Sequence, residues 1–206
     1  MKKLYLLRHG QTEFNVKKLV QGRCDSPLTD LGRKQAGMAA AWLKSHDVVP
    51  DKVVSSPLGR AMDTAQLVAT ELLGPDAAVE PCEGIIERCY GSFEEGPHGA
   101  LPTDVWDPGE DLVPFGGEGN QALQERMVDA LTNIMGSEGI ETLLAVSHGS
   151  ASRQFIKAAA PEGFELPTKL PNCAIMIFGF DDAREEDDTP QCKFTLQQIV
   201  DPQQSH

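Results

Sequence analysis

The stretch LYLLRHGQTEFN, residues 4–15, opens with an apolar run that ends on an Arg-His-Gly triplet. Further along the chain, the stretch TLLAVSHGS, residues 142–150, repeats the pattern with an apolar run that ends on Ser-His-Gly. In a parallel sheet whose strands are joined by helices, the strand ends at one edge form the crevice in which ligands bind. The two stretches therefore predict that His9 and His148 meet in such a crevice.

Strand and helix signals alternate along the rest of the chain. We expect strands at residues 3–7, 53–54 and 143–146, and helices at 29–45, 56–73, 121–134 and 150–159. Two β-rich runs follow at 172–180 and 192–200, joined by a charged connector at 181–191 that is typical of a solvated hairpin loop. This order predicts an α/β fold, a three-layer α/β/α sandwich whose central sheet is mostly parallel with one antiparallel edge strand.

The 206 residues suit one domain, residues 1–206, which is long enough to bury an apolar core. Within it, residues 91–120 are rich in glycine and proline and lack a clear periodicity. Long loops in compact domains commonly carry function, for example as lids over a site. We therefore expect this segment to be a lid insertion over the edge of the sheet.

Composition argues against several classes of protein. The formal net charge of −13 disfavours nucleic-acid binding, which needs a basic face. No apolar run approaches the length of a spanning helix, and the first strand leads into polar residues rather than a signal-peptide pattern, so we expect no membrane attachment and a cytoplasmic location. The five cysteines lack CxxC spacing, which predicts free thiols rather than a metal or redox site.

The residues at the two strand ends suit phosphoryl transfer without a metal or cofactor. His9 can act as the nucleophile and form a phosphohistidine, and His148 can donate to the phosphate from the opposite strand. Arg8 and Arg60 offer planar guanidinium groups for bidentate contacts to phosphate oxygens, and Arg60 falls in the first turn of a predicted helix. Glu87, which follows an apolar pair, is the best candidate for the proton donor to the leaving group.

Five motifs, in order along the chain, resemble those of the histidine phosphatase superfamily, in its phosphoglycerate mutase-like branch (branch 1). They are LRHGQTEFN, QGRCDSPLTDLGRKQA, SSPLGRAMDTA, ERCYGSFEEG and VSHGSASR, and they cover most of residues 4–153. A single RHG triplet would be a weak signal, whereas five motifs in the family's order are specific. The resemblance implies the family's fold and a phosphoryl-transfer reaction on a small phosphomonoester.

The resemblance also assigns roles to single residues. It implies that His9 is the nucleophile, that Arg8, Arg60 and His148 form the phosphate pocket, and that Glu87 acts as acid and then as base. It further implies phosphate or substrate contacts at Asn15, Gln21, Gly22 and the backbone N–H of Gly149. The family often has glycine at the position that Glu95 occupies here.

The lid segment favours hydrolysis over a mutase reaction. A mutase holds a substrate with two anionic ends, which requires extra cations at the pocket and a lid that excludes water. Residues 89–125 contain no lysine or arginine, and the family's mutases resemble one another in a longer, arginine-containing insert here. We therefore predict a phosphomonoesterase, with a cofactor-dependent phosphoglycerate mutase as the alternative.

Further alternatives and questions stay open. A non-catalytic domain that binds phosphorylated ligands would be expected to lack His9 or Glu87, and both are present. A metallophosphatase would need clustered Asp, Asn and His ligands, which the remaining histidines do not form. The physiological substrate and the oligomeric state are not predicted. Four lid aromatics could line the leaving-group site or simply pack beneath the lid: Tyr90, Phe93, Trp106 and Phe115.

Overall fold

The computed structural model describes residues 1–161, 163–182 and 193–204. The strands in these residues form one six-stranded sheet in the order β3-β2-β4-β1-β5-β6. Their bounds are β1 Lys2–Arg8, β2 Lys52–Ser55, β3 Glu80–Pro81, β4 Thr142–Ser147, β5 Ile175–Phe180 and β6 Phe194–Val200. Strands β3, β2, β4 and β1 are parallel, and antiparallel pairing is confined to β5 with its neighbours β1 and β6. The predicted α/β class, with a mostly parallel sheet and an antiparallel edge, is confirmed.

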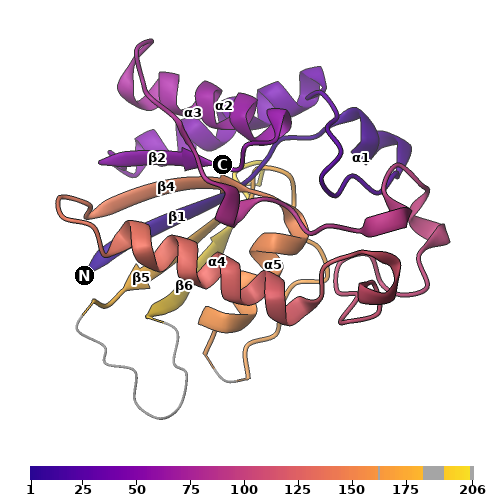
Figure 1. Cartoon of the computed structure of the whole chain (residues 1–206). Helices are drawn as coiled ribbons and strands as arrows, with labels where there is room; N and C mark the ends of the chain where they lie inside the picture. Colours follow the sequence, from indigo (N-terminus) through magenta and orange to yellow (C-terminus); the bar gives the residue numbers. More distant parts are fainter. Residues whose placement is uncertain (162, 183–192, 205–206) are drawn as a thin grey trace.

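Helices cover both faces of the sheet, as Figure 1 shows. Helices α2 (Asp30–Ser45) and α3 (Gly59–Leu73) pack on one face, and α4 (Asn120–Met135) and α5 (Gly149–Ala159) pack on the other. Strands β1 and β4 are buried on both faces, so their apolar runs are continuous rather than alternating. The three-layer arrangement follows from this two-sided burial.

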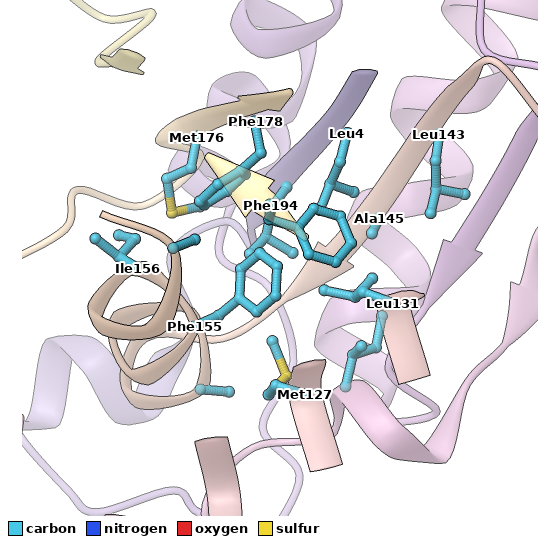
Figure 2. Packing of buried hydrophobic residues seen from close by; sticks show 14 of the residues in the cluster. Leu4, Met127, Leu131, Leu143, Ala145, Phe155, Ile156, Met176, Phe178 and Phe194 are labelled. Carbon is cyan, nitrogen blue, oxygen red and sulfur yellow. The ribbon is translucent and has the colours of Figure 1, made fainter. Parts of the chain in front are cut away.

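The core beneath α4 and α5 is rich in aromatic and long apolar side chains. Phe155 of α5 packs edge-on against Phe178 and Phe194, with ring centroids 4.9 Å and 5.0 Å away (Figure 2). Met127 and Leu131 of α4 extend the same cluster. This packing fixes α5 on the sheet, and α5 begins at Gly149, directly after His148.

Residues 91–120, which we expect to be a lid and call the lid segment, contain three short 3₁₀ turns, Gly91–Phe93, His98–Ala100 and Val113–Phe115, and end on the first residue of α4. A small apolar cluster of Val20, Tyr90, Leu101 and Leu112 anchors it. It lies beside α1 (Glu13–Lys17) at the right of Figure 1, and a β-bridge joins Leu19 to Pro97. The segment therefore covers the side of the molecule toward which the parallel strands point.

Several element boundaries differ from the sequence-based expectations. Helix α3 begins at Gly59 rather than at Ser56, because the backbone N–H of Ser56 still donates to the Val146 carbonyl, 2.9 Å away, and prolongs the strand pairing. The short helix α1 and the two-residue strand β3 were not predicted. The charged connector expected at 181–191 lies, from residue 183 on, outside the described residues. No helix in the described part of the chain is long and apolar enough to cross a membrane.

Candidate active site

The first and second strand-histidine units lie side by side. Strands β1 and β4 pair in parallel with Arg8 opposite Ser147, so both strands end at the same edge of the sheet. The next residues, His9 and His148, have ring centroids 5.1 Å apart. The structure therefore brings together the two imidazoles that the sequence places at strand ends.

His9 is held in one tautomer and one orientation. Its side chain is buried, and Nδ1 lies 2.7 Å from the carbonyl oxygen of Gly10, to which it donates. Burial first, and then the charges of Arg60 and Arg8, lower the pKa of His9 well below its usual value. His9 is therefore neutral at physiological pH, with the lone pair on Nε2, which is the form that a nucleophile requires.

His148 is buried behind His9 and contacts Ser56. Its Nε2 lies 2.7 Å from Ser56 Oγ, which also accepts from the backbone N–H of Leu58 at 3.4 Å. If the Ser56 hydroxyl donates to Nε2, the proton of the neutral imidazole lies on Nδ1. Burial, followed by Arg60 and His9, lowers the pKa of His148 well below 6.5. Nδ1 is buried without a partner in the described residues, so it is a free donor in this tautomer.

Arg8 and Arg60 are both buried, but neither guanidinium group has all of its N–H donors free for a phosphate. Both terminal nitrogens of Arg60 donate to backbone carbonyls of the adjoining loop, Nη1 to Cys24 and Nη2 to Gly22, each at 2.7 Å. Arg8 donates through Nη1 to the Leu170 carbonyl. In both side chains Nε is buried without a partner among the described residues. The expected bidentate contact from Arg60 to a phosphate is therefore not available through its terminal nitrogens, which hold the loop in place. Only Nε of Arg60 stays unpaired.

Unpaired buried donors are costly unless a ligand satisfies them. Three unpaired buried nitrogens occur in this site, Nε of Arg8, Nε of Arg60 and Nδ1 of His148, and with His148 in the tautomer described above they suit an anion with several acceptor oxygens. The ring of Trp106 lies over the Arg8 guanidinium, with 5.0 Å between Cζ and the ring centroid. The arrangement fits one phosphoryl group beside His9.

Glu87 lies at the amino-terminal end of α5. Its Oε1 accepts from the backbone N–H groups of Arg88 and Ala151 at 2.8 Å and 2.9 Å, and its Oε2 accepts from Ser150 at 3.2 Å. These donors and the positive end of the helix fix the carboxylate in one position. Glu87 lines the same pocket as His9, so it can exchange a proton with a group bound there.

The pocket spans about 430 Å³, part of it open to solvent. Its lining includes the four contact residues that the resemblance implied, namely Asn15, Gln21, Gly22 and Gly149. Gly149 has no room for a side chain, because a Cβ would meet the Trp106 ring. Arg60 and His148 do not line the pocket. They lie behind it: Arg60 binds the carbonyls of Gly22 and Cys24, and His148 lies beside His9.

The lid aromatics divide into two groups. Tyr90 and Trp106 line the pocket, whereas Phe93 and Phe115 pack edge-on against each other with ring centroids 5.0 Å apart. Glu95, which stands where the family often has glycine, has φ of 65°. A non-glycine residue therefore occupies a backbone conformation that favours glycine.

Sequence reasoning missed several residues of the site. Ser150 could have been found, because it directly follows the VSHG motif and its N–H binds Glu87. His98 lines the pocket from the lid and contacts the Leu19 carbonyl through Nε2 at 3.2 Å, but no motif marks it. No cluster of three or more His, Cys, Asp or Glu side chains that could hold a metal occurs in residues 1–161, 163–182 and 193–204.

The buried histidines predict that acid destabilises the fold. Below pH 6.5 an unfolded chain protonates its histidines, whereas His9 and His148 resist protonation in the folded state, because their pKa values are lowered. The unfolded state then binds more protons, so the free energy of unfolding falls by about 1 kcal/mol per pH unit for each histidine. Urea unfolding at pH 7.5 and pH 5.5 measures this loss. His148→Asn should lose less than the wild type, and the exposed control His46→Asn should match the wild type; equal losses in all three would contradict the argument.

Comparisons with known proteins identify the family. The family model of the histidine phosphatase superfamily (branch 1) matches residues 4–189. A broad-specificity phosphatase of Saccharomyces cerevisiae is 32% identical over 166 residues, which cover 75% of this chain and 69% of the relative. A probable phosphoglycerate mutase of Cronobacter sakazakii is 32% identical over 183 residues, with 85% and 83% covered.

Solved structures have the same fold. A phosphoserine phosphatase of Entamoeba histolytica superposes with a TM-score of 0.74 at 27% identity and covers 98% of both chains. A mycobacterial glucosyl-3-phosphoglycerate phosphatase gives a TM-score of 0.70 at 26% identity, with 87% of this chain and 93% of that chain covered. With the family model matched over most of the chain, this protein belongs to branch 1 of the histidine phosphatase superfamily.

Proposed function

We propose that this chain is a metal-independent phosphomonoesterase that hydrolyses a small phosphorylated metabolite through a phosphohistidine at His9. One observation carries the proposal: a neutral His9, fixed through Nδ1, lies beside three unpaired buried nitrogens and shares a pocket with Glu87. A nucleophile, donors for the phosphate oxygens and a proton donor are what phosphoryl transfer needs. A candidate for each lies in the pocket or directly behind it, which supports the proposal.

The first step transfers the phosphoryl group to the enzyme. Nε2 of His9 forms the P–N bond as the ester P–O bond breaks, and Glu87 gives its proton to the leaving alkoxide. Three backbone N–H groups, those of Arg88, Ser150 and Ala151, hold the Glu87 carboxyl group in place for this transfer.

The second step returns the enzyme to its starting state. Glu87, now ionised, takes a proton from water, and the water oxygen attacks phosphorus as the P–N bond breaks. Inorganic phosphate leaves, and His9 is again neutral, with Nδ1–H donating to the Gly10 carbonyl. The same carboxylate therefore serves as acid and then as base.

The pocket lining supports hydrolysis of an ester with a leaving group of low charge. Beyond the phosphate side, the lining comes largely from Leu19, Val20, Tyr90, Val105 and Trp106, with His98 as a polar group. Among the described residues that line the pocket, Arg8 is the only arginine or lysine. A second anionic end would therefore be poorly compensated there, whereas an uncharged, hydrogen-bonding leaving group would fit.

The second candidate function is that of a cofactor-dependent phosphoglycerate mutase. It is favoured by relatives such as the probable phosphoglycerate mutases of Cronobacter sakazakii and Proteus mirabilis, which are 32% and 33% identical. The yeast phosphatase is equally similar, at 32%, and supports hydrolysis. Identity does not separate the two activities, so the preference for hydrolysis rests on the pocket lining.

A cytoplasmic location is part of the proposal. The cysteines Cys24, Cys82, Cys89 and Cys173 are all free thiols. Free thiols are typical of proteins in a reducing compartment.

Release of inorganic phosphate in EDTA tests the function. The panel contains neutral sugar phosphates, phosphoserine and 3-phosphoglycerate, the last with and without 2,3-bisphosphoglycerate, and 2-phosphoglycerate is measured in parallel. We expect free phosphate, no isomer, and no gain on adding Mg²⁺. Formation of 2-phosphoglycerate that depends on bisphosphoglycerate, without free phosphate, would establish the mutase instead.

A further inference from the structure

Arg88, the residue after Glu87, is fully buried and has no carboxylate bound to its guanidinium in the described residues. Its Nε donates to Ser150 Oγ at 2.9 Å, and Ser150 donates its backbone N–H to Glu87. Its Nη2 donates to Asn120 Oδ1 at 2.6 Å, and its Nη1 donates to the Glu118 carbonyl at 2.6 Å. A buried charge in such a place is costly, which makes each of these hydrogen bonds consequential.

The hydrogen bonds continue from Asn120 into the lid segment. Nδ2 of Asn120 donates to Asp107 Oδ1 at 2.8 Å. Asp107 also accepts from Gln154 and Lys157 of α5, at 3.0 Å and 2.6 Å. Asp107 directly follows Trp106, whose ring covers Arg8 and fills the space above Gly149. The contacts of Asp107 therefore hold the lid residue that closes the phosphate side of the pocket.

The direction of the two hydrogen bonds of Asn120 follows from the groups that it contacts. Arginine can only donate and an ionised aspartate can only accept, so the Asn120 amide must present oxygen to Arg88 and nitrogen to Asp107. Burial of Asp107 is the largest single effect and opposes its ionisation, but the hydrogen bonds from Lys157, Asn120 and Gln154 and the charge of Lys157 together outweigh it and lower the pKa of Asp107. The Asn120 amide thus joins the lid to the side of the site that holds the acid.

We propose that Asn120 and Arg88 are positioning residues that couple the lid at Trp106 and Asp107 to the carboxylate of Glu87. This inference rests on the proposed function, in which Glu87 protonates the leaving group. When the lid covers the phosphate, the chain Asp107–Asn120–Arg88–Ser150 holds the acid in place. Neither positioning residue touches the substrate.

The variant Asn120→Asp separates the two ends of the chain. An aspartate at 120 still accepts from Arg88, but it offers Asp107 a carboxylate in place of an N–H, so the lid contact becomes repulsive. An alkyl phosphate needs a proton on its leaving group, whereas an activated aryl phosphate does not. We expect the rate of the first step on the alkyl ester to fall about tenfold, the effect of losing one buried hydrogen bond. The burst rate on the aryl ester, which isolates its first step from the later hydrolysis of phosphohistidine, should fall less than about twofold.

A swapped pair and a matched control complete the experiment. In the double variant Asp107→Asn, Asn120→Asp, the amide and the carboxylate exchange places and the hydrogen bond can form again. The alkyl-to-aryl ratio of the first-step rates should therefore return to within about threefold of wild type. The control is Glu110→Gln. The Glu110 carboxylate also lies in the lid segment, but it accepts from the N–H of Gln121 and takes no part in the hydrogen bonds from Asp107 to Ser150, so both rates should stay unchanged. The urea midpoints of all variants establish that each is folded.

The outcomes separate the two proposals. A wild-type enzyme that releases phosphate from neither ester refutes the proposed function, and the coupling with it. A wild type that hydrolyses both esters, with an Asn120→Asp variant that is unaffected or loses both activities equally, refutes the coupling alone. Loss confined to the alkyl ester, reversed by the swap, supports it.

Discussion

The variant His9→Ala should lose turnover by at least about 10⁴-fold and should form no phosphoenzyme. Alanine removes the nucleophile, while the donors around it, Arg8 and His148 among them, stay in place to bind phosphate. The variant should therefore still bind inorganic phosphate, which isothermal titration calorimetry measures. Steady-state phosphate release and labelling with a radioactive phosphomonoester give the two catalytic readouts.

The matched control for this variant is His46→Ala. His46 is the exposed C-cap of α2, where it stacks on Trp42, and it should be dispensable for activity. Its activity and labelling are expected to equal those of the wild type. A His9→Ala enzyme that still carries an acid-labile phosphoryl label would show that another residue is the nucleophile.

The variant Glu87→Gln should slow poor leaving groups far more than good ones. Glutamine cannot give up a proton, so an alkyl phosphate should be cleaved about 10³-fold more slowly, within the range of general acid catalysis. The leaving group of an activated aryl phosphate departs without a proton, and its first step should slow about tenfold or less. Burst kinetics on the aryl ester isolate that step from the later hydrolysis of phosphohistidine.

Glu83→Gln is the control for Glu87→Gln. Glu83 is an exposed residue four positions earlier in the chain, and its replacement should change neither rate. Equal losses on alkyl and aryl esters in Glu87→Gln would instead assign Glu87 the structural role of capping α5, which its bonds to Ser150 and Ala151 also permit.

The strands and helices that carry strong periodic signals were predictable from sequence. The apolar runs before His9 and His148 can be buried on both faces only in the centre of a parallel sheet, which is where β1 and β4 lie. The helix expected at residues 29–45 is α2, whose N-cap is Thr29, and the Thr29 side chain accepts from the Gly32 N–H. Short elements escaped because they depend on local capping: α1 is formed by reciprocal hydrogen bonds between Thr12 and Asn15.

The convergence of the site was predictable in part. Strand ends placed His9 and His148 at one edge, and the family motifs added the arginines and Glu87. The state of the arginines was not predictable, because the carbonyls that Arg60 binds come from a loop without periodicity. The link from the lid to Arg88 joins residues 32 positions apart through one amide, and no sequence pattern marks such a contact.

The most direct test of the central claim is the site of the phosphoryl group during turnover. The wild-type enzyme is mixed with a phosphomonoester in EDTA, quenched with alkali within milliseconds, and analysed by mass spectrometry of the intact chain and of its peptides. We predict one added phosphoryl group, located on His9 and lost to water as inorganic phosphate. Release of phosphate in a single turnover without any phosphorylated His9, or with the group on another residue, would contradict the account.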